Sequence, residues 1–213
     1  MSFLARITGL TIALTVGAAP SFGQDSKPKG TGTPVESPPA AAVEYDTHSW
    51  KEFSDERGMF IIIFPGMPIE ADNSSGETVG RKFTLKTSAF YFVGYQDFPA
   101  SLTVELEKDA GLRKQFFDSA VERVVSQTTA KVLSEADVTI ADHPGRFVKF
   151  GLSNGGVLRQ HMYIVGKRTY QIFVITPKEL MTVDGGHFDE MRATKFLQSF
   201  KLAGPNHNDG SKQ

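Results

Sequence analysis

The seven-residue run Met59–Pro65 (MFIIIFP) is the feature that most constrains what this chain can fold into. It lies between Gly58 and Gly66 and consists mainly of β-branched and aromatic residues. A membrane-spanning helix needs about 20 apolar residues, so this run is too short to cross a bilayer. Its composition and its Pro-Gly ending predict a strand that is buried on both faces. We therefore expect it to be the core strand of a covered sheet.

Turn signals divide much of the remaining chain into further strands. The residues ADHPG (141–145), Asn154-Gly155 and Gly166-Lys167 predict three turns of an antiparallel meander, and Asn-Gly is the strongest short hairpin signal among them. An alternating segment and an aromatic segment, joined at Ser88-Ala89, predict an earlier strand pair. The expected strands are 81–87, 89–99, 131–140, 146–152, 156–166 and 168–177.

Two helices are predicted from apolar residues at helical spacing. Asp109 is a typical N-cap for a helix from Ala110 to about Thr128, and a second helix is expected within Phe188–Phe200, with a tail that returns to the sheet. Trp50 and Phe53 are three residues apart and predict a short helical turn. The expected elements are thus β-hairpins, a long helix, a β-meander and a C-terminal helix, in that order. This order predicts an α+β fold, in which a long central helix and a C-terminal helix cover an antiparallel β-sheet.

The chain resembles the PsbP-like fold. The stretches that carry this resemblance occur in order across residues 50–202: GMFIIIFPGMP, YFVGYQDFP, KVLSEADVTIADHPGRFVKF, RQHMYIVGKRTYQIFV and FLQSFKL. The fold is shared by the photosystem II protein PsbP, a Ran-binding import factor and exported bacterial proteins of unknown function, and the last group is the most similar. These motifs are turns and core aromatics, so the resemblance implies a fold and assigns no functional residue.

The two ends of the chain have compositions that differ from the middle. Residues 1–23 match a signal peptide, with Arg6, an apolar run and small residues before Gln24, and they predict export to the periplasm or beyond the cell. Cleavage after Ala19 and an uncleaved anchor are the alternatives. Residues 24–43 predict a disordered Pro/Gly-rich linker, with a Pro-rich ligand as the alternative. We expect one α+β domain at 44–203 and a flexible tail at 204–213.

Charge and cysteine content exclude several classes of function. The net charge is −1, which disfavours nucleic acid as a partner, and after signal cleavage no membrane span is expected. The chain has no cysteine, which excludes disulfides, thiolate zinc sites, a cysteine nucleophile and a bacterial lipoprotein anchor. Gly155-Gly156 and Gly185-Gly186 lack a nucleotide-binding context, so no cofactor is expected. We expect a monomer.

One strand predicts a patch that could bind anions. Arg159, His161 and Tyr163 alternate along the expected strand 156–166, with Lys149 expected across the hairpin. A guanidinium on a rigid strand suits a carboxylate or phosphate. A solvated sheet face with cross-strand ion pairs would give the same pattern. On the first interpretation, the chain is an exported non-catalytic binding or accessory module for an unknown protein or a small anionic ligand.

The alternative is an extracytoplasmic hydrolase or metal-dependent enzyme that uses His143, His161 or His187. Asp142-His143 could be a catalytic pair displayed on a turn, although turn chemistry explains both residues equally well. His187 precedes Asp189 and Glu190, which could add carboxylates, but acidic residues are also typical of a helix start. Two histidines and a carboxylate in one pocket would favour this enzyme hypothesis.

Overall fold

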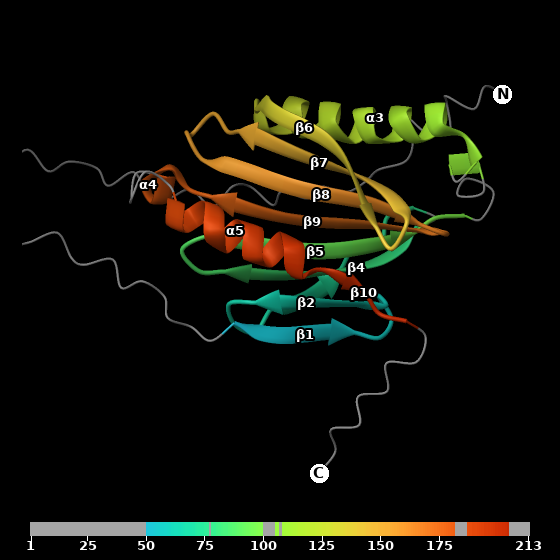
Figure 1. The fold of residues 1–213 in the computed structure, drawn as a ribbon, viewed down its shortest axis with the longest axis horizontal. Helices are drawn as coiled ribbons and strands as arrows, with labels where there is room; N and C mark the ends of the chain where they lie inside the picture. The colour runs from blue at the N-terminus through green and yellow to red at the C-terminus, as the bar shows by residue number, and fades with distance from the viewer. Residues whose placement is uncertain (1–49, 77, 100–104, 107, 182–186, 205–213) are drawn as a thin grey trace, which may run out of the picture.

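The computed structural model describes residues 50–76, 78–99, 105–106, 108–181 and 187–204. The expected signal peptide (1–23), the linker (24–43) and nearly all of the tail (204–213) lie outside the described residues. Within the described part, two antiparallel sheets and their flanking helices form an α+β fold that is rich in sheet (Figure 1). The predicted fold class is thus confirmed in its broad form.

The larger sheet has seven strands, each antiparallel to its neighbours. The meander β6-β7-β8-β9 forms one half, and β9 pairs with β5, which joins the meander to the earlier strands. In spatial order the strands are β3 (Ile69–Asp72), β4 (Val79–Lys86), β5 (Phe90–Asp97), β9 (Arg168–Thr176), β8 (Val157–Val165), β7 (His143–Gly151) and β6 (Lys131–Ile140).

The smaller sheet combines the two ends of the domain. Its strands β1 (Lys51–Asp55), β2 (Phe60–Phe64) and β10 (Lys201–Leu202) have β2 in the centre. The helical turn predicted at Trp50 and Phe53 is wrong, because all five residues of Lys51–Asp55 pair in register with β2. The predicted return of the C-terminal tail to a sheet is confirmed, since Lys201 pairs with Ile61.

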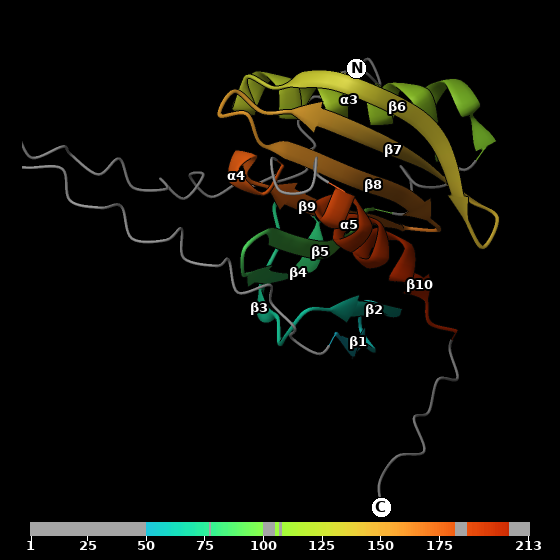
Figure 2. The same cartoon turned by 60° about the vertical axis from the view of Figure 1, so that its left-hand side comes forward.

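The strand predicted from Met59–Pro65 is β2, but only one of its faces is fully buried. Phe60, Ile62 and Phe64 have no exposed surface, whereas Ile61 and Ile63 are half-buried. The expectation of two buried faces is therefore wrong. Its cause is that the small sheet is an outer layer, with one face on the core and the other partly open to solvent (Figure 2).

Two helices, α3 and α5, pack against the larger sheet. The predicted helix α3 (Ala110–Thr128) is confirmed, and the Asp109 carboxylate caps it by accepting from the amides of Gly111 at 2.7 Å and Leu112 at 3.0 Å. Helix α5 (His187–Ser199) follows the short helix α4 (Lys178–Met181). Among the described helices, none has an apolar stretch long enough to cross a bilayer.

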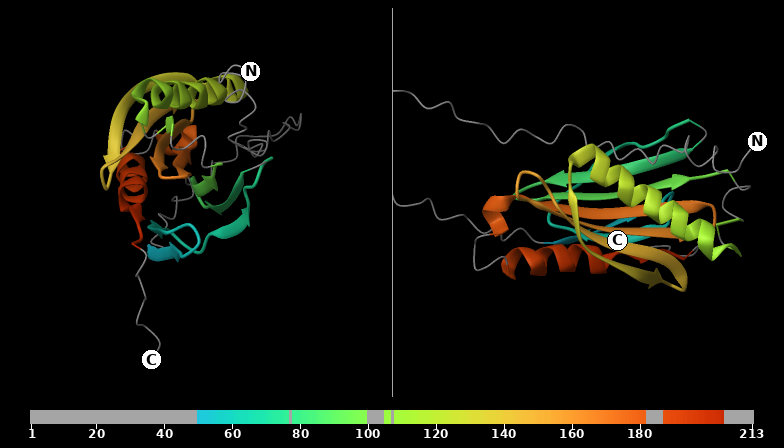
Figure 3. Two further views of the ribbon diagram at one scale, coloured as in Figure 1. Left: turned by 90° about the vertical axis from the view of Figure 1, so that its right-hand side faces the viewer. Right: turned by 90° about the horizontal axis from the view of Figure 1, so that it is seen from above.

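The faces of the larger sheet contribute to two separate hydrophobic cores. Buried residues of α3 pack with one face, and those of α5 and β2 pack with the other (Figure 3). Alternate residues of β5 follow this division, because Phe92 lies in the first core while Tyr91 and Tyr95 lie in the second.

The predicted meander turns are confirmed at Asn154-Gly155 and at Gly166. The turn predicted at 141–145 is shorter than expected, because only Ala141 and Asp142 form it, with φ of 45° and 67°. The following three residues belong to β7. Glycine is needed at position 145 because the chain packs closely there: a Cβ would lie 2.3 Å from the Tyr163 ring.

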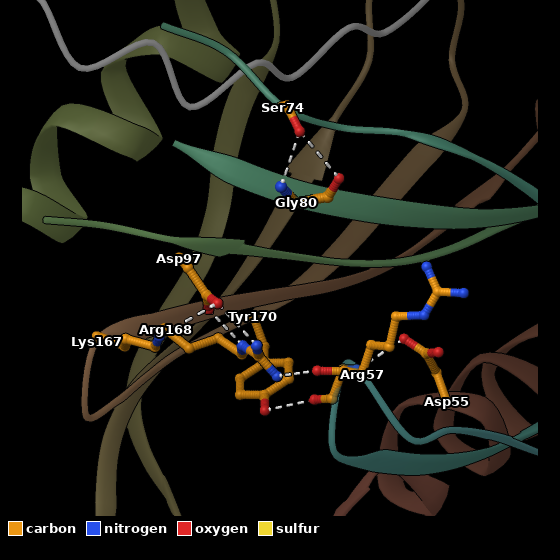
Figure 4. Close-up of polar contacts among 9 residues, drawn as sticks. Asp55, Arg57, Ser74, Gly80, Asp97, Lys167, Arg168 and Tyr170 are labelled. Atoms are coloured by element: carbon orange, nitrogen blue, oxygen red, sulfur yellow. Dashed lines mark hydrogen bonds and ion pairs between the residues drawn. The ribbon is translucent and has the colours of Figure 1, made fainter. Parts of the chain in front are cut away.

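A group of hydrogen bonds and one ion pair joins the two sheets at one end (Figure 4). Arg168 forms a bidentate pair with Asp97, with Nη2 2.9 Å from Oδ2, and donates from Nη1 to the Arg57 carbonyl at 2.7 Å. The Tyr170 hydroxyl donates to the Gly58 carbonyl at 2.7 Å. These bonds fix the β1–β2 hairpin onto the ends of β5 and β9.

Candidate functional site

The four residues of the predicted anion-binding patch lie on one face of the larger sheet. Arg159, His161 and Tyr163 come from β8, and Lys149 of β7 is the direct cross-strand partner of Arg159. Helix α5 packs against β8 and β9 on this face. The expected alternation and the expected position of Lys149 are thus found. Whether these residues bind a ligand stays a prediction.

Arg159 is buried, in contrast to the exposed position that a solvated or ligand-binding patch implies. Only 1% of its surface is accessible, because the first turn of α5 covers it. Its Nη1 lies 3.1 Å from Asp189 Oδ2, and its Nη2 contacts Glu190 Oε2. The Thr176 hydroxyl accepts from Arg159 at 3.3 Å and donates to Asp189 at 2.7 Å. Arg159 therefore attaches α5 to the sheet, and sequence periodicity does not reveal this role.

Glu190 connects the buried cation to a partly exposed one, Lys149. Its side chain is half exposed, and the same Oε2 that contacts Arg159 lies 3.5 Å from Lys149 Nζ. Burial opposes ionisation of this carboxyl, but the hydrogen bond and charge of Arg159, together with Lys149, outweigh it and hold the pKa of Glu190 below its ordinary value. The two cations of the predicted patch thus share one carboxylate of the protein itself.

His161 and Tyr163 form a neutral pair. Burial lowers the pKa of His161 to about 4 and raises the pKa of Tyr163. His161 Nδ1 and the Tyr163 hydroxyl oxygen are 3.0 Å apart and share a hydrogen bond, and Phe147 lies edge-on against the imidazole. The imidazole therefore adds no positive charge to this face at neutral pH.

Two of the three histidines of the enzyme hypothesis, His143 and His161, have described side chains, and these two lie apart. His161 lies opposite Phe147, four residues along β7 from His143, which corresponds to ~13 Å of strand. The side chain of His187 lies outside the described residues. Among the described side chains, no group of three or more His, Asp or Glu residues is placed to hold a metal ion.

A pocket of about 370 Å³ lies where α3 begins and the β6–β7 hairpin turns. The start of α3 and the β6–β7 turn both lie toward the right-hand end of the molecule in Figures 1 and 2. Its lining comes from α3, from both strands of the hairpin and its turn, and from β8: Arg113, Thr139, Asp142, His143, Pro144 and Ile164. Sequence analysis named Asp142-His143 as a candidate catalytic pair on a turn. It did not identify Arg113, Thr139 or Ile164, because no local signal links α3 to this hairpin.

The polar side chains of this pocket make few contacts with the rest of the described chain. Arg113 is held in place by a hydrogen bond of 3.0 Å from Nη1 to the Leu106 carbonyl. Within the part of the chain that the structure describes, no hydrogen bond or ion pair engages the side chains of Thr139, Asp142 or His143. Ile164 is buried and gives the pocket an apolar base. Apolar walls with a few converging polar groups are typical of ligand-binding pockets.

No family model matches the sequence, and no curated protein matches it. Among solved structures, the chain is similar to the solution structure of cyanobacterial PsbP (CyanoP) from Synechocystis, with 12% identity and a TM-score of 0.48 over 76% of this chain and 98% of that one. It is also similar to protein PA94 of Pseudomonas aeruginosa, of unknown function, with 12% identity and a TM-score of 0.38 over 68% of this chain and 94% of that one. The resemblance to PsbP noted from the sequence thus recurs among solved structures. At 12% identity and with both TM-scores below 0.5, these likenesses assign no activity or ligand to this chain.

Proposed function

We propose that this chain is an exported, non-catalytic binding module that takes a small polar ligand into the pocket between α3 and the β6–β7 hairpin. One observation carries this proposal. The side chains of Thr139, Asp142 and His143 line a pocket of about 370 Å³ and make no hydrogen bond or ion pair with other described residues. Ligand pockets range from roughly 300 to 1,000 Å³, so this one suits a small molecule.

Binding is favoured over catalysis by the contacts within the pocket. A nucleophilic enzyme needs a nucleophile and a base within hydrogen-bond reach, with a third group that orients the base. Among the described residues, Thr139 and His143 share no hydrogen bond, and no side chain orients the imidazole. The pocket therefore has groups that can recognise a ligand but lacks a connected catalytic arrangement in its described part.

A fragment screen by amide NMR tests the pocket and does not require the identity of the natural ligand. We expect small polar fragments to shift the amide signals of Thr139, Asp142, His143 and Ile164 in the full chain. Thr139 is exposed on the edge strand β6, so Thr139→Tyr should fill the pocket mouth and suppress these shifts without unfolding the domain.

Ser134→Tyr provides the control, because Ser134 is likewise exposed on the edge strand β6 and is not part of the pocket lining. This variant should retain the fragment-induced shifts. If no fragment perturbs the four amides, or if Thr139→Tyr leaves the shifts unchanged, the pocket is not a binding site.

Export is the second part of the proposal and is supported by the signal-like residues 1–23. We expect the mature protein to begin near Gln24 and to be recovered outside the cytoplasm. N-terminal sequencing of the protein from fractionated cells measures this directly. Recovery of the intact chain from Met1 in the membrane or cytoplasmic fraction would contradict it.

A further inference from the structure

His161 lies on the face of β8 against which α5 packs, but its neighbours across the sheet are apolar. Its cross-strand partners are Phe147 on β7 and Ile172 on β9, and the Phe147 ring lies edge-on at 5.2 Å between ring centroids. The imidazole is only partly exposed. Among the described residues, its one hydrogen-bond partner is the Tyr163 hydroxyl, whose oxygen is 3.0 Å from Nδ1. These surroundings suit the neutral form of the ring.

The charged groups nearest to His161 along this face are cations that already have partners. Arg159 is two residues away on β8, and Lys149 is its cross-strand partner on β7. The carboxylates that α5 brings to this face, those of Asp189 and Glu190, contact these two cations. A proton on His161 would therefore add a third positive charge beside two paired ones.

The other titratable groups around this position are engaged elsewhere or lie farther along the sheet. They are Arg192 and Lys195 of α5, which lie over the Trp50 ring, Arg168 and Tyr170 of β9, which bond to Asp97 and to the Gly58 carbonyl, and His143 of β7, four residues from Phe147. The side chain of His187 lies outside the described residues. Among the described side chains, none provides a counter-ion for an imidazolium at position 161.

Burial in these surroundings makes the protonation of His161 unfavourable in the folded domain. It lowers the pKa of His161 to about 4, whereas a histidine in an unfolded chain has a pKa of about 6.5. The unfolded chain therefore takes up the proton first as the pH falls. The stability that comes from a neutral His161 is complete above about pH 6.5 and is lost progressively as the pH falls toward 4.

A row of aromatic rings connects His161 to the C-terminal end of the domain. The Tyr163 ring stacks on Phe200 at 6.0 Å with an interplanar angle of 6°, and Phe200 packs against Phe60 of β2 at 5.7 Å. Phe200 lies in the chain between α5 and β10. When Nδ1 takes up a proton it becomes a donor to the Tyr163 oxygen, so the tyrosine hydrogen loses its acceptor. Protonation thus disturbs the residue on which Phe200 stacks.

We propose that His161 is an acid-sensitive switch, and that its protonation loosens the packing of Phe200 and β10 against β2 and the larger sheet. Histidine suits this role because its charge changes in mildly acidic solution. The proposal is independent of the ligand pocket, whose apolar base, Ile164, belongs to the core on the other face of the sheet.

Amide hydrogen exchange of the full chain at pH 7 and pH 5, corrected for intrinsic exchange rates, tests the proposal. The Ala203 amide donates to the Met59 carbonyl at 2.8 Å and the Ile63 amide to the Ser199 hydroxyl at 3.0 Å, so both report on the C-terminal segment. We expect their protection to fall roughly 20-fold between these pH values, which is the linkage for one histidine with the two pKa values above. Amides in the middle of α3 should lose clearly less.

Three variants identify the titrating group. His161→Gln cannot take up the proton but keeps an oxygen that can accept from Tyr163, so it should abolish the pH dependence at Ala203 and Ile63. Tyr163→Phe retains the imidazole and should retain the pH dependence. Glu190→Gln removes the nearest titratable carboxylate of α5 and should also leave the change between pH 7 and pH 5 as in the wild type.

Each outcome decides for or against the switch. The same pH dependence in His161→Gln as in the wild type, or an equal loss of protection in α3 and in the C-terminal segment, would overturn it. If His161→Gln does not fold, an NMR titration of the wild-type ring decides instead. We expect the His161 ring signals to change with a midpoint below pH 5, and a midpoint near pH 6.5 would refute the proposal.

Discussion

Replacing Arg159 by alanine is expected to destabilise the domain by about 3–5 kcal/mol, the range found when one partner of a buried ion pair is removed. Asp189 is 4% exposed and would lie in the protein interior without the cation that compensates it. The loss should appear as a lower denaturation midpoint with an unchanged denaturant slope.

Two controls distinguish this effect from a general loss of packing. Lys149→Ala removes a partly exposed cation that contacts the same Glu190, and its cost should stay below about 1 kcal/mol. The double variant Arg159→Met with Asp189→Asn removes both charges and should recover much of the lost stability. If Arg159→Ala costs no more than Lys149→Ala, Arg159 does not hold α5 to the sheet.

Shortening Ile62 to alanine is expected to cost about 2–5 kcal/mol, the range for a large aliphatic side chain removed from a packed core. Ile62 has no exposed surface and lies in the core shared by β2, α5 and the larger sheet. Outside its own sheet, β2 packs mainly against α5, so this truncation would leave a cavity in the core that joins the small sheet to the helix.

The neighbouring Ile61 offers a matched control of the same residue type. It is half-buried on the opposite face of β2, so Ile61→Ala should cost clearly less than Ile62→Ala. Chemical denaturation of both variants measures the difference. Equal losses would mean that both faces of β2 are covered, as the sequence alone had predicted.

Sequence signals predicted the elements that are determined locally. Asp109 caps α3 through amides two and three residues away, and Asn154-Gly155 closes its hairpin within five residues, so both signals are contained in short segments. The strand pair predicted at 81–87 and 89–99 was also found, as β4 paired with β5. The α+β class follows from the order of such segments.

Features that depend on distant segments could not be predicted in the same way. The strand Lys51–Asp55 has no clear local pattern and is extended because β2 pairs with it. The burial of Arg159 depends on Asp189 and Glu190, which lie in another element. The pocket likewise requires Arg113 to meet the β6–β7 hairpin, so only its Asp142-His143 edge could be identified from sequence.

The position of β2 between β1 and β10 also affects when the domain can finish folding. Lys201 pairs with Ile61, and the Ser199 hydroxyl accepts a hydrogen bond from the Ile63 amide at 3.0 Å. Synthesis proceeds from the N-terminus, so one edge of β2 stays open until nearly the whole domain has been made. Contacts between such distant residues slow folding, because a large loop must close before they can form. The nascent chain thus exposes one edge of an apolar strand until late in synthesis, and such an unpaired edge favours aggregation until β10 covers it.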